Sequence, residues 1–181
     1  TDVAGMIAAA KDDRAMFFGS KRSLAIEEPT AFTEGFSCAK FTNTYASGNT
    51  PRDVKFVDMD IPFIRLAEAY LTYAEAKTYL GETDAAKTAI DALRDRANNP
   101  NKQPSYSLAD ICDEWAREFA FEGRRRIDLI RFGKFGGNSD YIWEWKGGIK
   151  AGTNFSPDKN VYGIPTKDLV SNSNLVQNPG Y

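Results

Sequence analysis

The segment Ile111–Phe132, I-C-D-E-W-A-R-E-F-A-F-E-G-R-R-R-I-D-L-I-R-F, mixes many charged side chains with large apolar ones. Its apolar residues recur at helical spacing, which predicts one buried helix from Leu108 to about Phe132, capped by Ser105 or Ser107. Buried charges are costly unless they are paired. The segment therefore predicts a network of ion pairs inside a helical fold.

Three carboxylates in this segment, Glu114, Glu118 and Glu122, stand four residues apart and would repel one another on a helix. We therefore expect arginines to approach them, from within the segment and from Arg65 on another helix, because the planar guanidinium pairs with carboxylates through two hydrogen bonds. Pairs at spacings of three or four are available between Glu122 and Arg125, Arg124 and Asp128, and Asp128 and Arg131. The predicted structural ion network consists of Arg65, Glu68, Glu114, Glu118, Glu122, Arg125, Asp128 and Arg131.

An alternative interpretation assigns these glutamates to acid–base catalysis. Carboxylates matched with arginines should have low pKa values, which suit neither a general acid nor a neutral proton donor. We therefore favour the structural interpretation. Gly123 inside the predicted helix costs about 1 kcal/mol relative to alanine, which indicates close approach of another backbone.

A second helical region precedes this segment. Asp60 is expected to cap a helix over residues 62–80 that is buried on most sides, and Gly81 is expected to end it in a left-handed turn. Thr83 or Asp84 begins the next helix, which Asn98 and the following residues end. This pair has the length of a tetratricopeptide repeat, and a single repeat cannot bury its outer faces.

The sequence as a whole predicts a mainly α fold with long irregular loops and a few short strands. Residues 1–59 are expected to form loops and short strands, residues 60–132 the helical core, and residues 133–181 an irregular aromatic segment. No clear domain boundary is visible. Because the chain begins with threonine and its first residues do not resemble a signal peptide, we expect a piece of a longer protein.

Composition excludes several functions for these 181 residues. The net charge of −2 gives no electrostatic case for nucleic acid, and no apolar run is long enough to span a bilayer. Without histidine, the chain cannot build a Ser-His-Asp site or a histidine-ligated zinc site. Cys38 and Cys112 lack metal-ligand spacing, and free thiols are favoured over a disulfide. The aspartates at 12, 13, 58 and 60 do not match a calcium loop.

Three motifs in order resemble the SusD/RagB family. Glu114–Phe132 resembles its pattern E-R-x-x-E-L-x-x-E-G-x-R-x-x-D-L-x-R-W, with Trp115 where arginine is usual. Asp60–Ala76 resembles its R-x-x-E-x-x-L-x-x-A-E-A segment. Ile164-Pro165 followed by Asn174–Tyr181 resembles its ending, and Asp13-Arg14 weakly resembles a D-x-R feature.

The resemblance implies the C-terminal region of a lipid-anchored, cell-surface protein of the outer membrane. Such a protein would have a SusD-like α-α superhelix, would bind an oligo- or polysaccharide without catalysis or cofactor, and would work with a SusC-like, TonB-dependent transporter. A second hypothesis is a helical-repeat scaffold that docks on the transporter without touching ligand. A glycoside hydrolase would need two carboxylates across a cleft, one with a raised pKa, which the paired acids here disfavour.

Within this piece, the expected glycan contacts are Asn138, Asp140, Tyr141, Trp143 and Trp145. Sugars bind flat aromatic faces with polar groups beside them. Tyr141, Trp143 and Trp145 alternate, so they would share one face of an extended segment. The alternative is that these rings pack inside their own domain, because large aromatic residues are mostly buried. A second candidate is the aromatic loop from Phe32 to Tyr45.

Overall fold

The computed structural model describes residues 11–19, 21–41, 43–45, 47–53, 55–137 and 140–181. The chain divides into two compact units, Thr1–Gly123 and Arg124–Tyr181. The first unit contains β1 (Phe17–Phe18), β2 (Ser37–Cys38), α2 (Leu66–Tyr79), α3 (Thr83–Arg96) and α4 (Leu108–Glu118). The division falls inside the segment predicted as one long helix.

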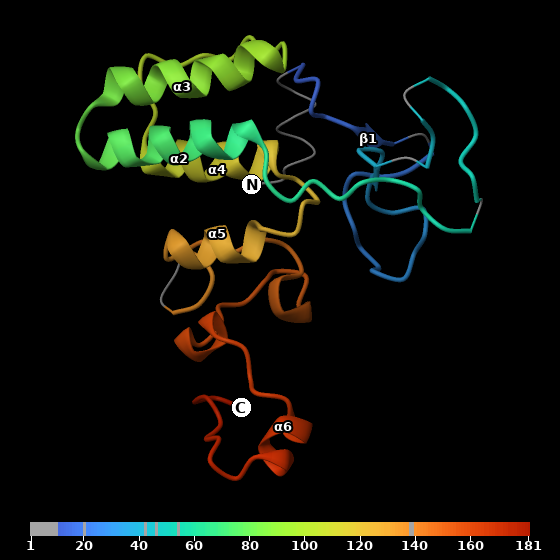
Figure 1. Ribbon diagram of the computed structural model, residues 1–181, viewed down its shortest axis with the longest axis vertical. Coiled ribbons are helices and arrows are strands. Elements are labelled where there is room, and N and C mark those ends of the chain that lie inside the picture. The colour runs from blue at the N-terminus through green and yellow to red at the C-terminus, as the bar shows by residue number, and fades with distance from the viewer. Residues whose placement is uncertain (1–10, 20, 42, 46, 54, 138–139) are drawn as a thin grey trace. The chain divides into compact units, whose positions relative to one another are not determined.

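α2 and α3 form an antiparallel hairpin, and α4 also packs against α2 (Figure 1). The turn between α2 and α3 contains Gly81 at a φ of +76°, as predicted. The predicted start of α2 is wrong, because residues 61–65 are irregular and the helix begins at Leu66 after an extended Arg65. Asp60 therefore does not cap α2, since Arg65 holds the position before its first residue.

α4 begins with a capping box. The Ser107 side chain accepts a hydrogen bond from the Asp110 backbone N–H, and the Asp110 carboxylate accepts one from the Ser107 N–H at 2.8 Å. These contacts satisfy backbone donors that a helix start leaves without partners. Of the two predicted caps, the structure therefore selects Ser107.

The prediction of one helix from Leu108 to Phe132 is wrong. α4 ends at Glu118, and α5 (Arg125–Arg131) is a separate helix in the second unit. Between them Phe121 and Gly123 both adopt left-handed backbone, with φ of +61° and +78°. Such residues interrupt a right-handed helix. The helical spacing of apolar residues continues across this break, so the spacing gives no sign that the helix ends.

Gly123 also has a different role from the predicted one. A Cβ atom added at this glycine would meet nothing within 4 Å, so no other backbone approaches it closely. Its positive φ is the reason for glycine here, because only glycine adopts this conformation at little cost. Ile127 and Phe121, large apolar residues of the segment predicted to be one buried helix, are 60% and 61% exposed.

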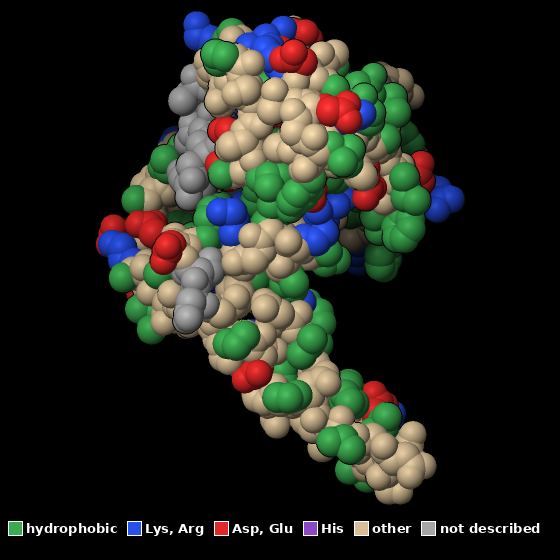
Figure 2. All heavy atoms as spheres, turned by 90° about the vertical axis from the view of Figure 1, so that its left-hand side faces the viewer, with side chains coloured by type: hydrophobic (Ala, Val, Ile, Leu, Met, Phe, Trp, Pro, Cys, Tyr) green, Lys and Arg blue, Asp and Glu red, His purple; other side chains and the backbone are tan. Residues whose placement is uncertain are grey.

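The core of the first unit lies where α2, α3 and α4 meet. Its fully buried apolar side chains include Leu71, Ile90, Ile111 and Trp115. The small residues Ala74, Ala86 and Ala89 are also buried, which lets the helices approach closely. The expectation that α2 is buried on most sides is wrong for this chain, because its buried residues are Ala67, Leu71 and Ala74. Apolar side chains lie open at the molecular surface (Figure 2).

Among the described residues that precede α2, the structure contains loops and the short strands β1 and β2. β1 and β2 pair antiparallel, with Phe17 opposite Cys38 and Phe18 opposite Ser37. Both cysteines are free thiols, and Cys112 is buried in α4. The mainly helical fold class is confirmed.

The second unit follows α5 with two 3₁₀ turns, η1 (Lys146–Gly148) and η2 (Pro157–Asn160), and a short helix, α6 (Thr166–Ser171). The predicted irregular ending therefore contains one helix that sequence patterns missed. α6 has no side-chain cap and no buried residue, so neither a capping motif nor an apolar stripe predicts this helix from the sequence. Among the described residues, no helix has the length and apolarity that crossing a bilayer requires.

Candidate functional site

Ion pairs in the first unit converge on the two glutamates in the body of α4. Glu118 is 2% exposed and its carboxylate contacts three arginines from three parts of the chain. Arg14 Nη1 lies 2.9 Å from Glu118 Oε2, and Arg96 Nη2 lies 2.7 Å from the same oxygen. Arg65 Nη1 donates to Oε1. The cluster joins the N-terminal loop, α3 and the start of α2 to α4.

Arg65 connects the start of α2 to Glu122, which lies beyond the end of α4. Its Nε and Nη2 donate to the two Glu122 carboxylate oxygens at 2.9 and 2.8 Å, a two-bond pairing. The Arg65 guanidinium carbon also stands 3.9 Å from the centre of the Phe119 ring. The Lys40 ammonium group also donates a hydrogen bond to Glu122.

The same cations close the C-terminal end of α4. Arg65 Nη2 donates to the Glu118 carbonyl oxygen at 2.5 Å, and Lys40 Nζ donates to the carbonyl oxygens of Glu118 and Ala120 at 3.3 and 3.0 Å. The last carbonyl groups of a helix lack partners within it and carry partial negative charge. Cations at this position therefore stabilise the helix end as well as the carboxylates.

Glu114 is fully buried and is the second centre of the network. Arg94 Nη2 from α3 and Arg117 Nη1 from α4 donate to its Oε2 at 2.7 and 2.8 Å. Arg14 Nη2 lies 2.9 Å from its Oε1. One guanidinium, that of Arg14, thus contacts Glu114, Glu118 and Asp12.

The contacts of Glu118 and Glu122 lower the pKa values of these two carboxylates. Burial alone would raise the pKa of Glu118, but the Arg65 hydrogen bond and the charges of Arg65, Arg14 and Arg96 outweigh it, so the pKa lies below its usual 4.5. Burial would likewise raise the pKa of Glu122. The hydrogen bonds from Arg65 and Lys40 outweigh this effect, so the pKa of Glu122 is also lowered. Acids held ionised in this way fix helices in place and are poor proton donors.

The lowered pKa values predict a loss of stability in acid. The folded-state pKa values of Glu118 and Glu122 lie below 4.5, so their stabilisation is fully present above pH 4.5 and is lost as pH falls through the lower folded-state values. We expect the melting temperature to fall steeply between about pH 4.5 and pH 3. Thermal unfolding followed by circular dichroism across this range measures it. A melting temperature constant down to pH 3 would contradict the network.

Two members of the network, Asp12 and Arg14, are absent from the set predicted from the sequence. Arg14 Nε and Nη2 donate to the two Asp12 oxygens at 2.8 and 2.6 Å, and Asn99 Nδ2 donates to Asp12 at 2.8 Å. Both Asp12 and Arg14 are buried. The signal that could have found them is the short D-x-R feature, which is formed by Asp12 and Arg14.

Arg94 was missed for another reason. It follows Ile90 by one helical turn and Leu93 by one residue, so it lies on the apolar side of α3 and is 3% exposed. A charged residue within an apolar stripe was the available signal. Glu68, which was predicted in the network, lies half-buried in the first turn of α2, where a negative charge complements the helix dipole.

Trp115 occupies the place where the family pattern has arginine, and it is fully buried. Its indole Nε1 donates to the Glu75 carboxylate at 3.1 Å, and its ring lies 5.3 Å from the Phe119 ring. The indole therefore supplies one hydrogen bond to a carboxylate of α2 and a large packing surface.

A separate set of ion pairs holds the second unit. Asp128 is buried in α5, and it accepts hydrogen bonds from Arg124 Nε at 3.0 Å and from Arg131 Nη2 at 3.2 Å. Arg125 Nη2 donates to the Tyr141 hydroxyl at 2.6 Å. The predicted set of charged residues is thus divided between two units, with Asp128, Arg125 and Arg131 in the second.

The aromatic segment is not a flat extended face. Asn138 lies outside the described residues, and Asp140 is exposed. Tyr141, Trp143 and Trp145 are half-buried, and the Tyr141 and Trp143 rings lie 6.0 Å apart, tilted by 58°. Trp145 has left-handed backbone, with φ of +64°, and directly precedes η1. The turn breaks the alternation on which a shared face of three rings depends.

Lys146 lies beside these rings and is fully buried. Its Nζ donates to the Tyr141 carbonyl oxygen at 3.0 Å and stands 4.6 and 5.3 Å from the centres of the Trp143 and Phe155 rings. Burial lowers the pKa of this ammonium group. One use of the Trp143 ring is therefore to cover a cation of its own unit.

Known proteins share sequence similarity with this chain. The profile of the SusD family matches residues 12–181. The starch-binding protein SusD of Bacteroides thetaiotaomicron is 44% identical over 97% of this chain, which spans 32% of that protein's length. The chain thus corresponds to about a third of this relative.

Two solved structures are also similar. Surface glycan-binding protein A from Bacteroides thetaiotaomicron is 29% identical, with a TM-score of 0.53 over 62% of this chain and 23% of that protein. Surface glycan-binding protein A from Bacteroides uniformis is 21% identical, with a TM-score of 0.68 over 93% of this chain and 38% of that protein, and supports the fold. With the family profile covering nearly all of it and its mainly helical fold shared by these neighbours, the chain belongs to the SusD family.

Proposed function

We propose that this chain is part of a non-catalytic, cell-surface protein that binds a glycan and delivers it to a TonB-dependent transporter of the outer membrane. The observation that carries the proposal is the 44% identity with a starch-binding protein over 97% of this chain. A second relative, 29% identical, is a surface glycan-binding protein. An α-glucan is accordingly the first ligand to test.

The ion network supports a binding protein over a hydrolase. A hydrolase needs one carboxyl group with a raised pKa to protonate the leaving oxygen. Glu118 and Glu122 have lowered pKa values, and Glu114 contacts Arg14, Arg94 and Arg117. These acids are engaged in fixing α4 to its neighbours.

Calorimetric titration of the longer protein with maltooligosaccharides tests the binding proposal. We expect saturable binding, with no release of reducing sugar over hours. A panel of other soluble glycans, such as xylan, mannan and fructan fragments, identifies the ligand class if starch fragments do not bind. Binding of none of them, with the protein folded by circular dichroism, would contradict glycan binding and would favour a scaffold that docks on the transporter.

Delivery to the transporter requires a separate experiment in the native cell. We expect deletion of the gene to slow growth on the bound polysaccharide while growth on its monosaccharide is unchanged. Co-purification of an outer-membrane barrel with the protein from detergent extracts supports the same step. Equal growth of deletion and parent strains on the polysaccharide would contradict a role in delivery.

The aromatic segment gives a more local prediction. If Trp145 and Asp140 contact the glycan, Trp145→Ala or Asp140→Ala should weaken binding about fivefold, since an aromatic contact and a polar contact each contribute about 1 kcal/mol. Tyr162→Ala is the matched control, because Tyr162 is exposed in the same unit and lies outside the segment. Unchanged affinity in both variants would assign these residues to packing and the glycan site to another part of the protein.

A further inference from the structure

A loop of the first unit, residues 21–35, holds one phenylalanine ring out in solvent. Phe32 is 85% exposed, whereas Phe36 and Phe41, which follow it in the predicted aromatic loop, are half-buried. Large aromatic side chains are mostly buried, because exposing an apolar ring to water costs free energy. Packing within the loop therefore does not explain a phenylalanine at position 32.

The backbone that carries the ring is fixed by hydrogen bonds inside the loop. Glu34 Oε2 accepts hydrogen bonds from the backbone N–H groups of Glu27 and Glu28 at 2.6 and 2.7 Å. The Ser23 N–H donates to the Thr33 carbonyl oxygen at 3.2 Å. These bonds join the two sides of the loop, so the ring is presented on a defined support.

Arg22 covers one face of this ring. Its guanidinium carbon lies 4.4 Å from the centre of the Phe32 ring, and its Nη1 donates to the Gly35 carbonyl oxygen at 3.2 Å. Among the described residues, neither Nε nor Nη2 of Arg22 has a hydrogen-bond acceptor. The ring and the guanidinium together thus offer an open aromatic face with N–H donors beside it.

This combination suits a sugar. The C–H groups of a pyranose ring pack on flat aromatic faces, and its hydroxyl oxygens accept hydrogen bonds from neighbouring donors. The charges of the loop indicate which sugars fit. Lys21 and Arg22 share the loop with three carboxylates, those of Glu27, Glu28 and Glu34, so no excess of positive charge attracts an acidic or sulphated sugar.

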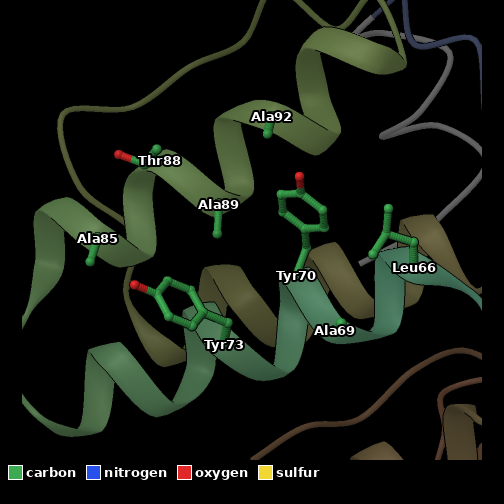
Figure 3. Close-up of a pocket in the computed structure, with 8 residues that line it drawn as sticks. All are labelled: Leu66, Ala69, Tyr70, Tyr73, Ala85, Thr88, Ala89 and Ala92. Atoms are coloured by element: carbon green, nitrogen blue, oxygen red, sulfur yellow. The ribbon is translucent and has the colours of Figure 1, made fainter.

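The apolar groove between α2 and α3, of about 580 Å³, has a different chemistry. Tyr70 and Tyr73 project from α2 toward alanines of α3 (Figure 3). The lining includes no charged residue, and the Thr88 hydroxyl already donates to the Asp84 carbonyl oxygen at 2.9 Å. Because sugars need several converging polar groups, this groove suits them less well than the ring beside Arg22.

We propose that Phe32 and Arg22 form a binding subsite for a neutral oligosaccharide. The subsite belongs to the first unit, whereas Tyr141, Trp143 and Trp145 belong to the second. The inference rests on the proposed glycan binding of the longer protein and adds a contact to it. Phe32 supplies the stacking face, and Arg22 supports that face from behind and donates to the hydroxyl oxygens.

Substitutions in the longer protein test the subsite by calorimetric titration. The probe is maltoheptaose, or the xylan, mannan or fructan fragment that binds if maltoheptaose does not. Phe32→Ala is expected to weaken binding about fivefold through loss of the stacking face. Arg22→Met should weaken it about as much, because methionine keeps the apolar contact with the ring but has no N–H donor. Circular dichroism checks that both variants remain folded.

The matched control is Phe56→Ala, which should leave the affinity unchanged. Phe56 is 73% exposed in the same unit, but among the described residues no cation stacks on its ring. If the longer protein binds and Phe32→Ala binds as tightly as Phe56→Ala, the subsite is overturned and the proposed function stands. If the longer protein itself binds none of these glycans, both are overturned.

A fluorine label reports the contact directly. In the longer protein, 4-fluorophenylalanine replaces Phe32 in one sample and Phe56 in another, and ¹⁹F NMR follows each resonance as the probe sugar is added. We expect a saturable shift at position 32, with the dissociation constant found by calorimetry, and no shift at position 56. No shift at position 32 despite calorimetric binding, or equal shifts at both positions, would overturn the subsite.

Discussion

Replacing Glu118 with glutamine is expected to lower the free energy of unfolding by about 3–5 kcal/mol, the usual cost of removing one partner from a buried ion pair. The carboxylate is almost fully buried and serves Arg14, Arg65 and Arg96 together. Glutamine keeps the shape but carries no charge, so Arg14, itself buried, would lose a counterion. Urea unfolding at pH 7 measures the change.

The matched control is Glu82→Gln. Glu82 pairs with Lys77 at 2.6 Å, but the pair is exposed, and exposed pairs contribute at most about 1 kcal/mol. If the two substitutions lowered the free energy of unfolding equally, burial would not be the reason for the stabilisation by the Glu118 contacts. A double variant, Glu118→Gln with Arg14→Met, should cost less than the sum of the two single changes, since both remove the same contact.

Replacing Trp115 with alanine is expected to lower the free energy of unfolding by about 3–5 kcal/mol through a different mechanism. The indole is fully buried beside Phe119, so its removal leaves a cavity where α2 and α4 meet. The change also removes the donor to Glu75. Urea unfolding provides the measurement, and an effect below about 1 kcal/mol would contradict the packing role.

Trp115→Phe separates the two contributions. Phenylalanine retains most of the apolar volume but lacks the N–H, so the loss should be about 2–3 kcal/mol, the cost of one hydrogen bond to a charged group together with a smaller cavity. A loss as large as that of the alanine variant would mean that the hydrogen bond to Glu75 dominates. The two variants therefore separate the packing of the indole ring from its hydrogen bond, at a position where arginine is usual in the family pattern.

The helix pair is the part of the fold that sequence patterns predict well. Apolar spacing, Gly81 and the alternatives for the start of α3 at Thr83 or Asp84 predict a hairpin, because these are local signals that act within one helical turn. Ser107 was likewise one of two predicted caps. The start of α2 was misplaced because Asp60 and Pro62 form a local start signal that the tertiary structure does not use.

The interruption after Glu118 could not be predicted in the same way. Helical spacing continues through residues 119–124, yet the backbone turns left-handed at Phe121 and Gly123. Arg65 and Lys40, which donate hydrogen bonds to the Glu118 carbonyl oxygen at the end of α4, lie far from it in the sequence. The reason for ending the helix there is therefore a long-range contact, which spacing within one segment does not contain.

Local patterns determined that this chain is mainly helical, that its core is rich in paired charges, and that its motifs resemble the SusD family, since periodicity, caps and residue types are properties of neighbouring residues. The tertiary structure alone decided which cations meet which carboxylates. It brought Asp12 and Arg14 to Glu114 and Glu118 across about a hundred residues, as the hydrogen bond between Arg14 and Glu118 spans 104 positions. Ion pairing depends on distance in space, and only the packing of α2, α3 and α4 sets that distance.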